Sequence, residues 1–203
     1  MTIRLASLPA RLALVATLGL AATPALAHPG HEAAGGFSQG FLHPFSGLDH
    51  VLAMVAVGLV AARIGGRARV LVPFSFLSMM IVGGALGTAG IALPFVEVGI
   101  ALSVMVLGAV LALRTPLPVA GAMLLVGAFA VFHGHAHGAE MPDAAYGLAY
   151  GLGFVAATAL LHAAGLGLGL IAGRSNRTAD RPALRVAGAA FAAAGLGLLA
   201  GAF

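Results

Sequence analysis

The feature that most constrains this chain is a series of long apolar stretches in which ionisable side chains are almost absent. Of its 203 residues, 61% are hydrophobic and only 8% are charged. A soluble domain needs charged groups on about a quarter or more of its surface positions, so this composition cannot cover a water-facing surface. A helix crosses a bilayer with about 20 apolar residues. The sequence therefore predicts an integral membrane protein built as one helical domain.

The apolar stretches after residue 36 have the length of membrane spans. No soluble domain or low-complexity linker separates them. The fifth stretch is longer than a bilayer requires, so we expect it to tilt, to bend at its glycines or to project beyond the lipid. The expected fold class is an all-α, six-transmembrane-helix bundle within residues 40–203. Its predicted spans are 40–62, 70–91, 94–113, 117–136, 143–171 and 183–202.

The N-terminus has the pattern of a secretory signal peptide over residues 1–27. Arg4 and Arg11 supply the positive start, residues 12–22 supply the apolar core, and Ala25-Leu26-Ala27 fits the small-x-small cleavage pattern. The alternative is an uncleaved first helix. Cleavage would place the mature N-terminus outside the cytoplasm.

Residues 28–39 would then form a histidine-containing periplasmic arm. The free α-amine and imidazole of His28 offer a chelating pair, and His31 follows closely. This arm is a candidate for metal capture above the membrane. The alternative is a solvated tail without a ligand role.

The arginines give an independent indication of topology, because all those after residue 27 fall in alternate connections. By the positive-inside rule, these connections face the cytoplasm. Together with an exported N-terminus and an even number of spans, this places both mature termini in the periplasm and the protein in a bacterial inner membrane. The arginines concerned are Arg63, Arg67, Arg69, Arg114, Arg174, Arg177, Arg181 and Arg185.

The first span begins with a histidine–acid cluster formed by His43, Asp49 and His50. In a regular helix His43 and His50 would share a face about 10 Å apart. Pro44 disfavours a helical conformation at His43, so this histidine is expected to fold back towards the helix start. Asp49 is a candidate for a direct ligand or for a group that orients a neighbouring imidazole.

The fourth predicted span ends with a second cluster formed by His133, His137 and Glu140. The spacings of four and three residues place these side chains on one helix face. His135 points almost oppositely in a regular helix. It would turn inward only if the flanking glycines unwind the segment, which is tolerated where the backbone lines a polar cavity.

The expected topology brings both clusters to the same membrane depth on the outer side. Glu97 lies at the start of the third span and therefore at the same depth. It is either a further metal ligand or a carboxylate that sits in water at the membrane interface. His162, in the fifth span, is either a helix–helix hydrogen-bonding group or a deeper relay or exit site. Holding so many ionisable groups at one depth is costly without a ligand, which disfavours a purely structural role for the two clusters.

The donor types point to a borderline divalent metal. The chain has no cysteine, so thiolate sites are excluded. Imidazole nitrogens with a few carboxylate oxygens suit nickel, cobalt, zinc or copper(II) better than calcium or copper(I). The affinity order alone does not choose among these four metals.

Two motifs in this sequence resemble the signatures of the HupE/UreJ family of bacterial nickel permeases. The resemblance extends over essentially the whole mature chain. It implies nickel uptake and carries His43, Asp49, His50, His133, His137 and Glu140 over as functional residues. The motifs are His43-x5-Asp49-His50 and Phe132-His133-Gly134-x-Ala136-His137-Gly138-x-Glu140.

We therefore expect a permease that imports a divalent transition metal from the periplasm, Ni²⁺ first, with Co²⁺, Zn²⁺ or Cu²⁺ as alternative ions. An enzyme and a permanent cofactor are not expected. The alternatives are an intramembrane zinc-dependent hydrolase and a metal-binding membrane protein that does not transport. The expected partners are the metal ion and the lipid bilayer. A homo-oligomer and cytoplasmic metallochaperones stay open, and nucleic acid is not expected because no basic run alternates with aromatics.

Overall fold

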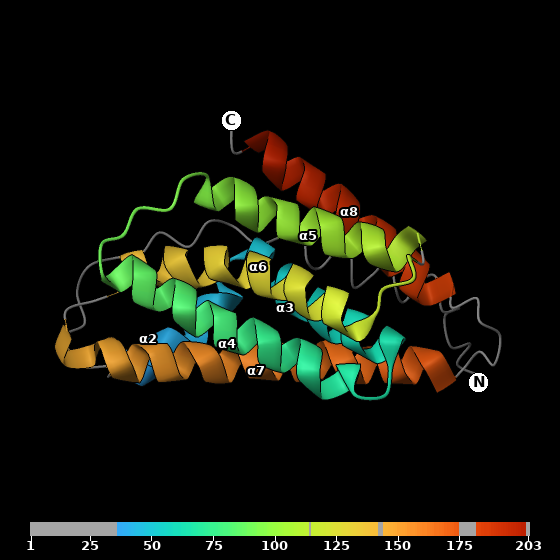
Figure 1. Ribbon diagram of the computed structural model, residues 1–203, viewed down its shortest axis with the longest axis horizontal. Helices are drawn as coiled ribbons and strands as arrows, with labels where there is room; N and C mark the ends of the chain where they lie inside the picture. Colours follow the sequence, from blue (N-terminus) through green and yellow to red (C-terminus); the bar gives the residue numbers. More distant parts are fainter. Residues whose placement is uncertain (1–35, 114, 142–143, 175–181, 202–203) are drawn as a thin grey trace, which may run out of the picture. The chain divides into compact units, whose positions relative to one another are not determined.

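The apolar stretches form helices, because in lipid each backbone polar group must find its partner within its own segment. The computed structural model describes residues 36–113, 115–141, 144–174 and 182–201 (Figure 1). Every element within these residues is helical. The predicted all-α fold class is thus confirmed for the described part of the chain. The signal peptide, His28 and His31 lie outside the described residues.

Five helices are long and apolar enough to cross a membrane. Their ends agree with the second to sixth predicted spans to within a few residues. The fifth span is a single helix of 31 residues, about 46 Å long at 1.5 Å per residue, and therefore longer than the hydrocarbon layer. These helices are α4 (Ala68–Thr88), α5 (Val96–Leu113), α6 (Val119–Ala139), α7 (Ala144–Arg174) and α8 (Pro182–Gly201).

The first predicted span, 40–62, is broken near the place where Pro44 predicts a disturbance of the helix. It consists of α2 (Gly36–Leu42), the short 3₁₀ helix η1 (His43–Phe45) and α3 (Leu48–Ile64), and the two halves are bent by 81°. Pro44 has no N–H to continue the α-helix. The backbone then turns extended at Gly47 (φ −109°, ψ 123°) before α3 begins. Counted as one broken span, this segment makes the sixth crossing.

Helix α3 lies at the centre of the bundle, where it packs against α4, α5, α6, α7 and α8. Its residues from Ala53 to Ala62 are almost entirely buried. The outer helices keep large apolar side chains exposed, such as Phe74 of α4 and Leu124 of α6. Lipid would cover these side chains, which is the usual arrangement in a membrane bundle.

Small residues let the helices pack in close pairs, as the glycine-rich sequence suggests. A Cβ added to Gly134 of α6 would lie 1.9 Å from the carbonyl oxygen of Met80 in α4, and one added to Gly138 would lie 2.2 Å from that of Gly84. Residue numbers rise together along this contact, so α4 and α6 run parallel. The contacts of α3 with α7 are likewise parallel, whereas those of α5 with α8 are antiparallel. The helix directions therefore alternate along the chain.

This alternation divides the bundle into two ends. The histidine end comprises η1, the first turn of α3, the last turns of α4 and α6, and the starts of α5 and α7. The arginine end comprises the opposite helix ends and carries the described arginines Arg63, Arg67, Arg69, Arg174 and Arg185.

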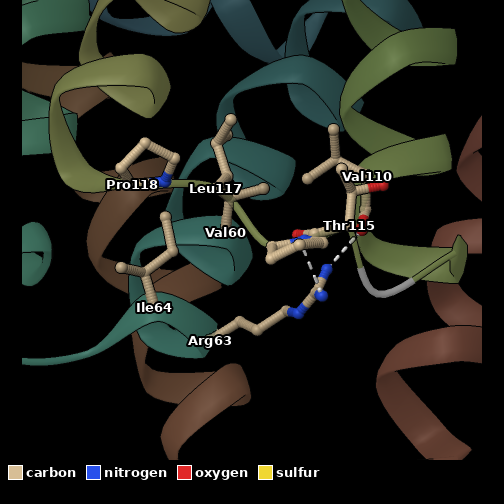
Figure 2. Close-up of a pocket in the computed structure, with 8 residues that line it drawn as sticks. Val60, Arg63, Ile64, Val110, Thr115, Leu117 and Pro118 are labelled. Carbon is tan, nitrogen blue, oxygen red and sulfur yellow. Dashed lines mark hydrogen bonds between the residues drawn. The ribbon is translucent and has the colours of Figure 1, made fainter.

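At the arginine end, Arg63 joins α3 to the end of α5 (Figure 2). Its guanidinium donates to the carbonyl oxygens of Val110 and Thr115. Val110 is in the last turn of α5, whose carbonyls have no partner within the helix, and Thr115 follows in the connection to α6. A cavity of about 400 Å³ lies beside this contact. Among its lining residues in the described chain, Arg63 is the only ionisable one.

Candidate metal centre

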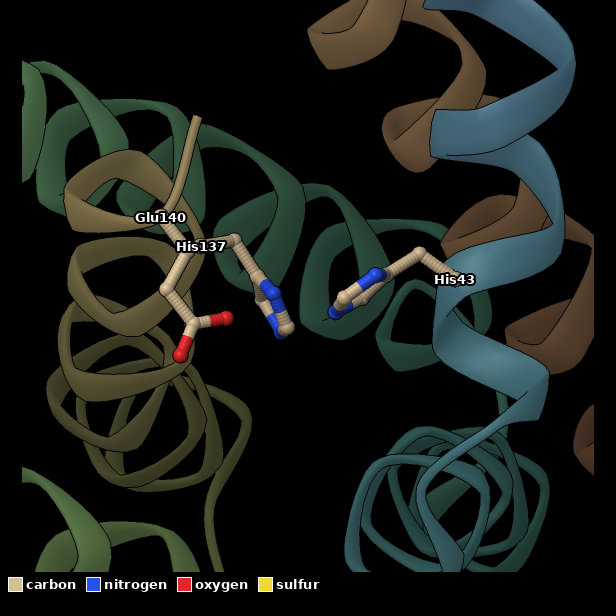
Figure 3. A group of neighbouring side chains, drawn as sticks. All are labelled: His43, His137 and Glu140. Carbon is tan, nitrogen blue, oxygen red and sulfur yellow. The ribbon is translucent and has the colours of Figure 1, made fainter. Parts of the chain in front are cut away.

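Side chains from both halves of the broken span meet the end of α6. One ligand atom each from His43, His137 and Glu140 lie within 4.8 Å of one another. Figure 3 shows the rings of His43 and His137 facing each other, with the Glu140 carboxylate beside His137. His137 is buried, His43 is partly buried and Glu140 is exposed. This group can hold a cation that arrives from the open side of Glu140.

His50 approaches the same histidine from α3. Its Nε2 lies 2.6 Å from Nε2 of His137, and its Nδ1 lies 2.8 Å from Oδ1 of Asp49. A carboxylate only accepts, so Nδ1 of His50 donates to Asp49. In the neutral ring, Nε2 of His50 then carries no proton, and its lone pair points at His137.

The distance between the Nε2 atoms of His50 and His137 is close to the distance between two imidazole nitrogens that bind one metal ion. Metal–imidazole bonds are 2.0–2.1 Å long, so two nitrogens on one ion stand about 2.9–3.4 Å apart. The two Nε2 atoms would need to separate by about 0.3–0.8 Å to admit a metal. Without a metal, Nε2–H of His137 supplies the proton that holds the pair together.

His133 is held in a defined tautomer by Ser103 of α5. The Ser103 hydroxyl donates its one proton to the carbonyl of Ile100 at 2.6 Å. It therefore accepts from Nε2–H of His133, which lies 2.9 Å away. Nδ1 of His133 is left as a buried lone pair, and no group in the described part of the chain hydrogen-bonds to it.

The four imidazoles form a continuous group. The ring of His50 lies against His137, with centroids 4.5 Å apart, and against His133, at 5.1 Å. The rings of His43 and His137 are 4.8 Å apart. Together with Asp49 and Glu140, the structure thus brings all six residues of the two sequence clusters into one group at the histidine end.

Helix α7 supplies an aromatic wall to this group. The ring of Phe154 lies 4.2 Å from that of His137, and the ring of Tyr150 lies 5.8 Å from that of His43. A largely apolar cavity of about 440 Å³, lined by His137 and by the glycine-rich faces of α4, α6 and α7, lies beside them. On the side of α7, His137 therefore meets aromatic rings, and its polar neighbours are the other histidines and the carboxylate of Glu140.

The charge at this end favours a cation. Two carboxylates, Asp49 and Glu140, belong to the group. The arginines that the structure describes all lie at the other end. A divalent ion would therefore meet net negative charge and neutral imidazoles.

Three other predicted residues stand apart from the group. Nε2 of His135 lies 2.7 Å from the carbonyl oxygen of Ile91, to which it donates, so this ring holds the α4–α5 connection. Glu97 is exposed at the start of α5. His162 is buried in α7, where its ring lies 5.0 Å from that of Phe76.

The residues that orient and enclose the histidines were not predicted from the sequence. Ser103 had a signal, because it is the only hydroxyl in the predicted span 94–113, where Glu97 is the only ionisable residue. Phe76, Tyr150 and Phe154 had none, since aromatic residues in an apolar helix are ordinary packing residues.

The chain is similar to known proteins over most of its length. Residues 15–198 match a family model described as HupE / UreJ protein. Among curated proteins, Protein HupE of Rhizobium leguminosarum bv. viciae is 47% identical over 190 residues, which cover 93% of this chain and 97% of the relative. No solved structure matches the chain significantly. The family match includes α2 to α7 in full and α8 except for its last three residues.

Proposed function

The chain belongs to the HupE/UreJ family, and from this premise we propose that it imports a divalent transition-metal ion, Ni²⁺ first. Family membership confirms the resemblance carried by the two histidine–acid motifs. The apolar helices make the chain a multi-pass membrane protein. We place it in the bacterial inner membrane with the histidine end towards the periplasm, because the arginine end would then face the cytoplasm.

The observation that carries the proposal is the convergence of the two clusters on His137. His43 and Glu140 offer ligand atoms within 4.8 Å of one of its own, and His50 offers a second imidazole nitrogen 2.6 Å from its Nε2. Residues almost ninety positions apart in the sequence thus present nitrogen and oxygen donors around His137. A group of this kind in a membrane bundle usually marks an ion path.

Capture of the ion at this site exchanges a proton for a metal. Imidazole ligands must be deprotonated, so metal binding releases protons. The proton on Nε2 of His137 is the one to leave when a cation enters between His137 and His50. Asp49 keeps its bond to Nδ1–H of His50, and the Glu140 carboxylate offsets part of the positive charge.

The membrane potential supplies a force for inward movement. A potential of 100 mV, negative inside, is worth about 2.3 kcal/mol per charge, and therefore about 4.6 kcal/mol for a divalent ion. The site must also release the ion. Donors spread over η1, α3 and α6 suit release better than a closed tetrahedral site.

Ni²⁺ as the first substrate rests on the family resemblance together with the donor set. Imidazole and carboxylate without thiolate also accept Co²⁺, Zn²⁺ and Cu²⁺. We therefore propose these three ions as alternative substrates. Competition between the four is part of the test.

The test is uptake of radioactive Ni²⁺ by the full chain in proteoliposomes, with Co²⁺, Zn²⁺ and Cu²⁺ as competitors. Wild type is expected to accumulate Ni²⁺, and Asp49→Asn and His133→Ala are expected to lose accumulation. His135→Ala is the matched control, because it removes a buried histidine outside the group. Bound metal without accumulation would contradict the proposal. Hydrolysis of a lipid or peptide without uptake would favour the enzyme alternative.

A further inference from the structure

His162 is a buried histidine to which the structure gives no hydrogen-bond partner. Only 2% of its surface is exposed, and within the described residues neither Nδ1 nor Nε2 meets a donor or acceptor. Buried polar groups are almost always paired, because an unpaired one is costly. His162 is thus in a different situation from His135, which is bonded to the carbonyl of Ile91.

This difference argues against a helix-joining role for His162. A histidine that fastens two membrane helices bonds to a group on the neighbouring helix. Helix α3 passes directly against His162, since a Cβ on Gly58 would lie 2.2 Å from the carbonyl oxygen of His162. The imidazole nonetheless makes no bond to α3 or to any other described element.

The position of His162 is deeper in the bundle than the candidate metal centre. Gly58 lies eight residues beyond His50 on α3, which is about 12 Å along the helix axis. Arg63, at the other end of the bundle, lies about 8 Å further along. His162 therefore stands at an intermediate depth between the two ends.

One aromatic ring connects His162 with the outer histidines. The ring of Phe76 stands edge-on to that of His162, with centroids 5.0 Å apart and an interplanar angle of 88°. The same ring lies 5.6 Å from that of His133. Phe76 is fully buried, and both histidines lie against its ring.

Two further donors lie near the same face of α7. Thr158 is one turn before His162, so the two side chains share a helix face. The Thr158 hydroxyl donates to the sulfur of Met80 at 3.8 Å, and both residues are buried. A thioether and a hydroxyl thus accompany the imidazole, which makes a weak set of donors suited to a borderline or soft divalent cation.

From these observations we propose that His162 is an inner binding station for the transported metal, reached from His133 past Phe76. The inference rests on the proposed transport function and adds a second site to it. One imidazole with weak neighbours binds loosely, and a path needs sites from which the ion can leave. The preferred occupant is a borderline divalent ion such as Ni²⁺, taken up as it leaves the outer group.

The experiment compares uptake and binding in the full chain with substitutions at this one position. Ni²⁺ and Cd²⁺ uptake is measured in proteoliposomes, and Ni²⁺ binding is measured by equilibrium dialysis in detergent. His162→Leu is expected to lower Ni²⁺ uptake at least about tenfold while Ni²⁺ binding at the outer group is kept. His135→Leu is the matched control and is expected to keep uptake.

A cysteine at the same position separates a ligand from a packing residue. Wild type has no cysteine, so His162→Cys introduces a single thiol. A thiolate favours softer metals, and this variant is expected to raise the ratio of Cd²⁺ to Ni²⁺ uptake severalfold. A residue that only fills space would not change the ion preference.

The outcomes separate the inner station from the proposed function. If wild type binds Ni²⁺ but accumulates none, the transport function itself fails. If wild type accumulates Ni²⁺ and His162→Leu does so at the same rate, only the inner station is overturned. If His162→Leu no longer binds Ni²⁺ at all, His162→Cys decides: a shifted ion preference supports the station and an unchanged one overturns it.

Discussion

At the scale of single residues, the candidate centre depends on which ring nitrogen of each histidine carries a proton. Asp49 fixes this for His50 and Ser103 fixes it for His133, because each bonds to one ring nitrogen and leaves the other nitrogen of the neutral ring with a lone pair. Partners of this kind orient a ligand and raise its basicity. Both lone pairs are then directed before the ion arrives.

Loss of the Ser103 hydroxyl should weaken metal binding without removing a ligand. In Ser103→Ala, Nε2–H of His133 loses its acceptor and the ring can rotate or change tautomer, so Ni²⁺ affinity should fall roughly tenfold. The folded state should lose about 1 kcal/mol of stability. Equilibrium dialysis and a thermal melt in detergent measure the two effects.

Ser75→Ala is the control for this substitution. The Ser75 hydroxyl also donates to a carbonyl in the bundle, that of Met123, but it touches none of the histidines. It should lose similar stability and keep wild-type affinity. Equal affinity losses in both variants would mean that Ser103 does not act through His133.

The histidines themselves could be predicted from sequence, but the groups that orient them could not. Helical spacing placed His133 and His137 on one face and His135 on the other, and the structure shows that division. Ser103 is thirty residues from His133 in sequence. Its pairing depends on how α5 packs against α6, which no local pattern encodes.

At the scale of elements, the break between η1 and α3 is what brings the first cluster together. In a regular helix His43 and His50 would stand about 10 Å apart on one face. The bend of 81° instead lets both reach His137. Pro44 predicted a disturbance at His43. The size of the bend depends on the extended backbone at Gly47 and on packing against α7, which sequence spacing does not specify.

Gly47 keeps space for the Asp49–His50 pair. Its backbone conformation suits any residue, but an added Cβ would lie 2.6 Å from Oδ1 of Asp49 and 2.8 Å from Nδ1 of His50. Gly47→Ala should therefore displace these side chains and lower Ni²⁺ affinity roughly tenfold, with little change in melting temperature. Wild-type affinity in this variant would show that the pair does not position the ligand.

The close contact of α4 with α6 should also be sensitive to an added methyl group, but here the main effect should be a lower stability of the folded protein. A Cβ at Gly134 would meet backbone rather than a movable side chain, so Gly134→Ala must force the two helices apart. Overpacking of this kind costs about 1–3 kcal/mol. Because Gly134 adjoins His133, metal binding should weaken as well, which dialysis on the same sample tests.

Gly167→Ala in α7 is the matched control, since a Cβ there has open space around it. Replacing a helix glycine with alanine at an open position should leave stability unchanged or raise it by up to about 1 kcal/mol. If both variants melt like wild type, the close α4–α6 contact is not a source of stability.

At the scale of the whole molecule, function depends on which end of the bundle faces which side of the membrane. The six ligand candidates lie at one end and the described arginines at the other, because successive helices alternate in direction. Uptake requires the histidine end to face the periplasm. The positive-inside rule predicts that the arginine end faces the cytoplasm, which is the orientation that the proposed uptake requires.

Single cysteines test this orientation directly, because wild type contains none. Ala92 lies exposed in the α4–α5 connection at the histidine end, and Thr115 lies exposed in the α5–α6 connection at the arginine end. A membrane-impermeant thiol reagent added from the periplasmic side should label Ala92→Cys in intact cells. It should label Thr115→Cys only after the inner membrane is permeabilised. The reverse pattern would place the metal ligands on the cytoplasmic side, where the same group could act in export or sensing but not in capture for import.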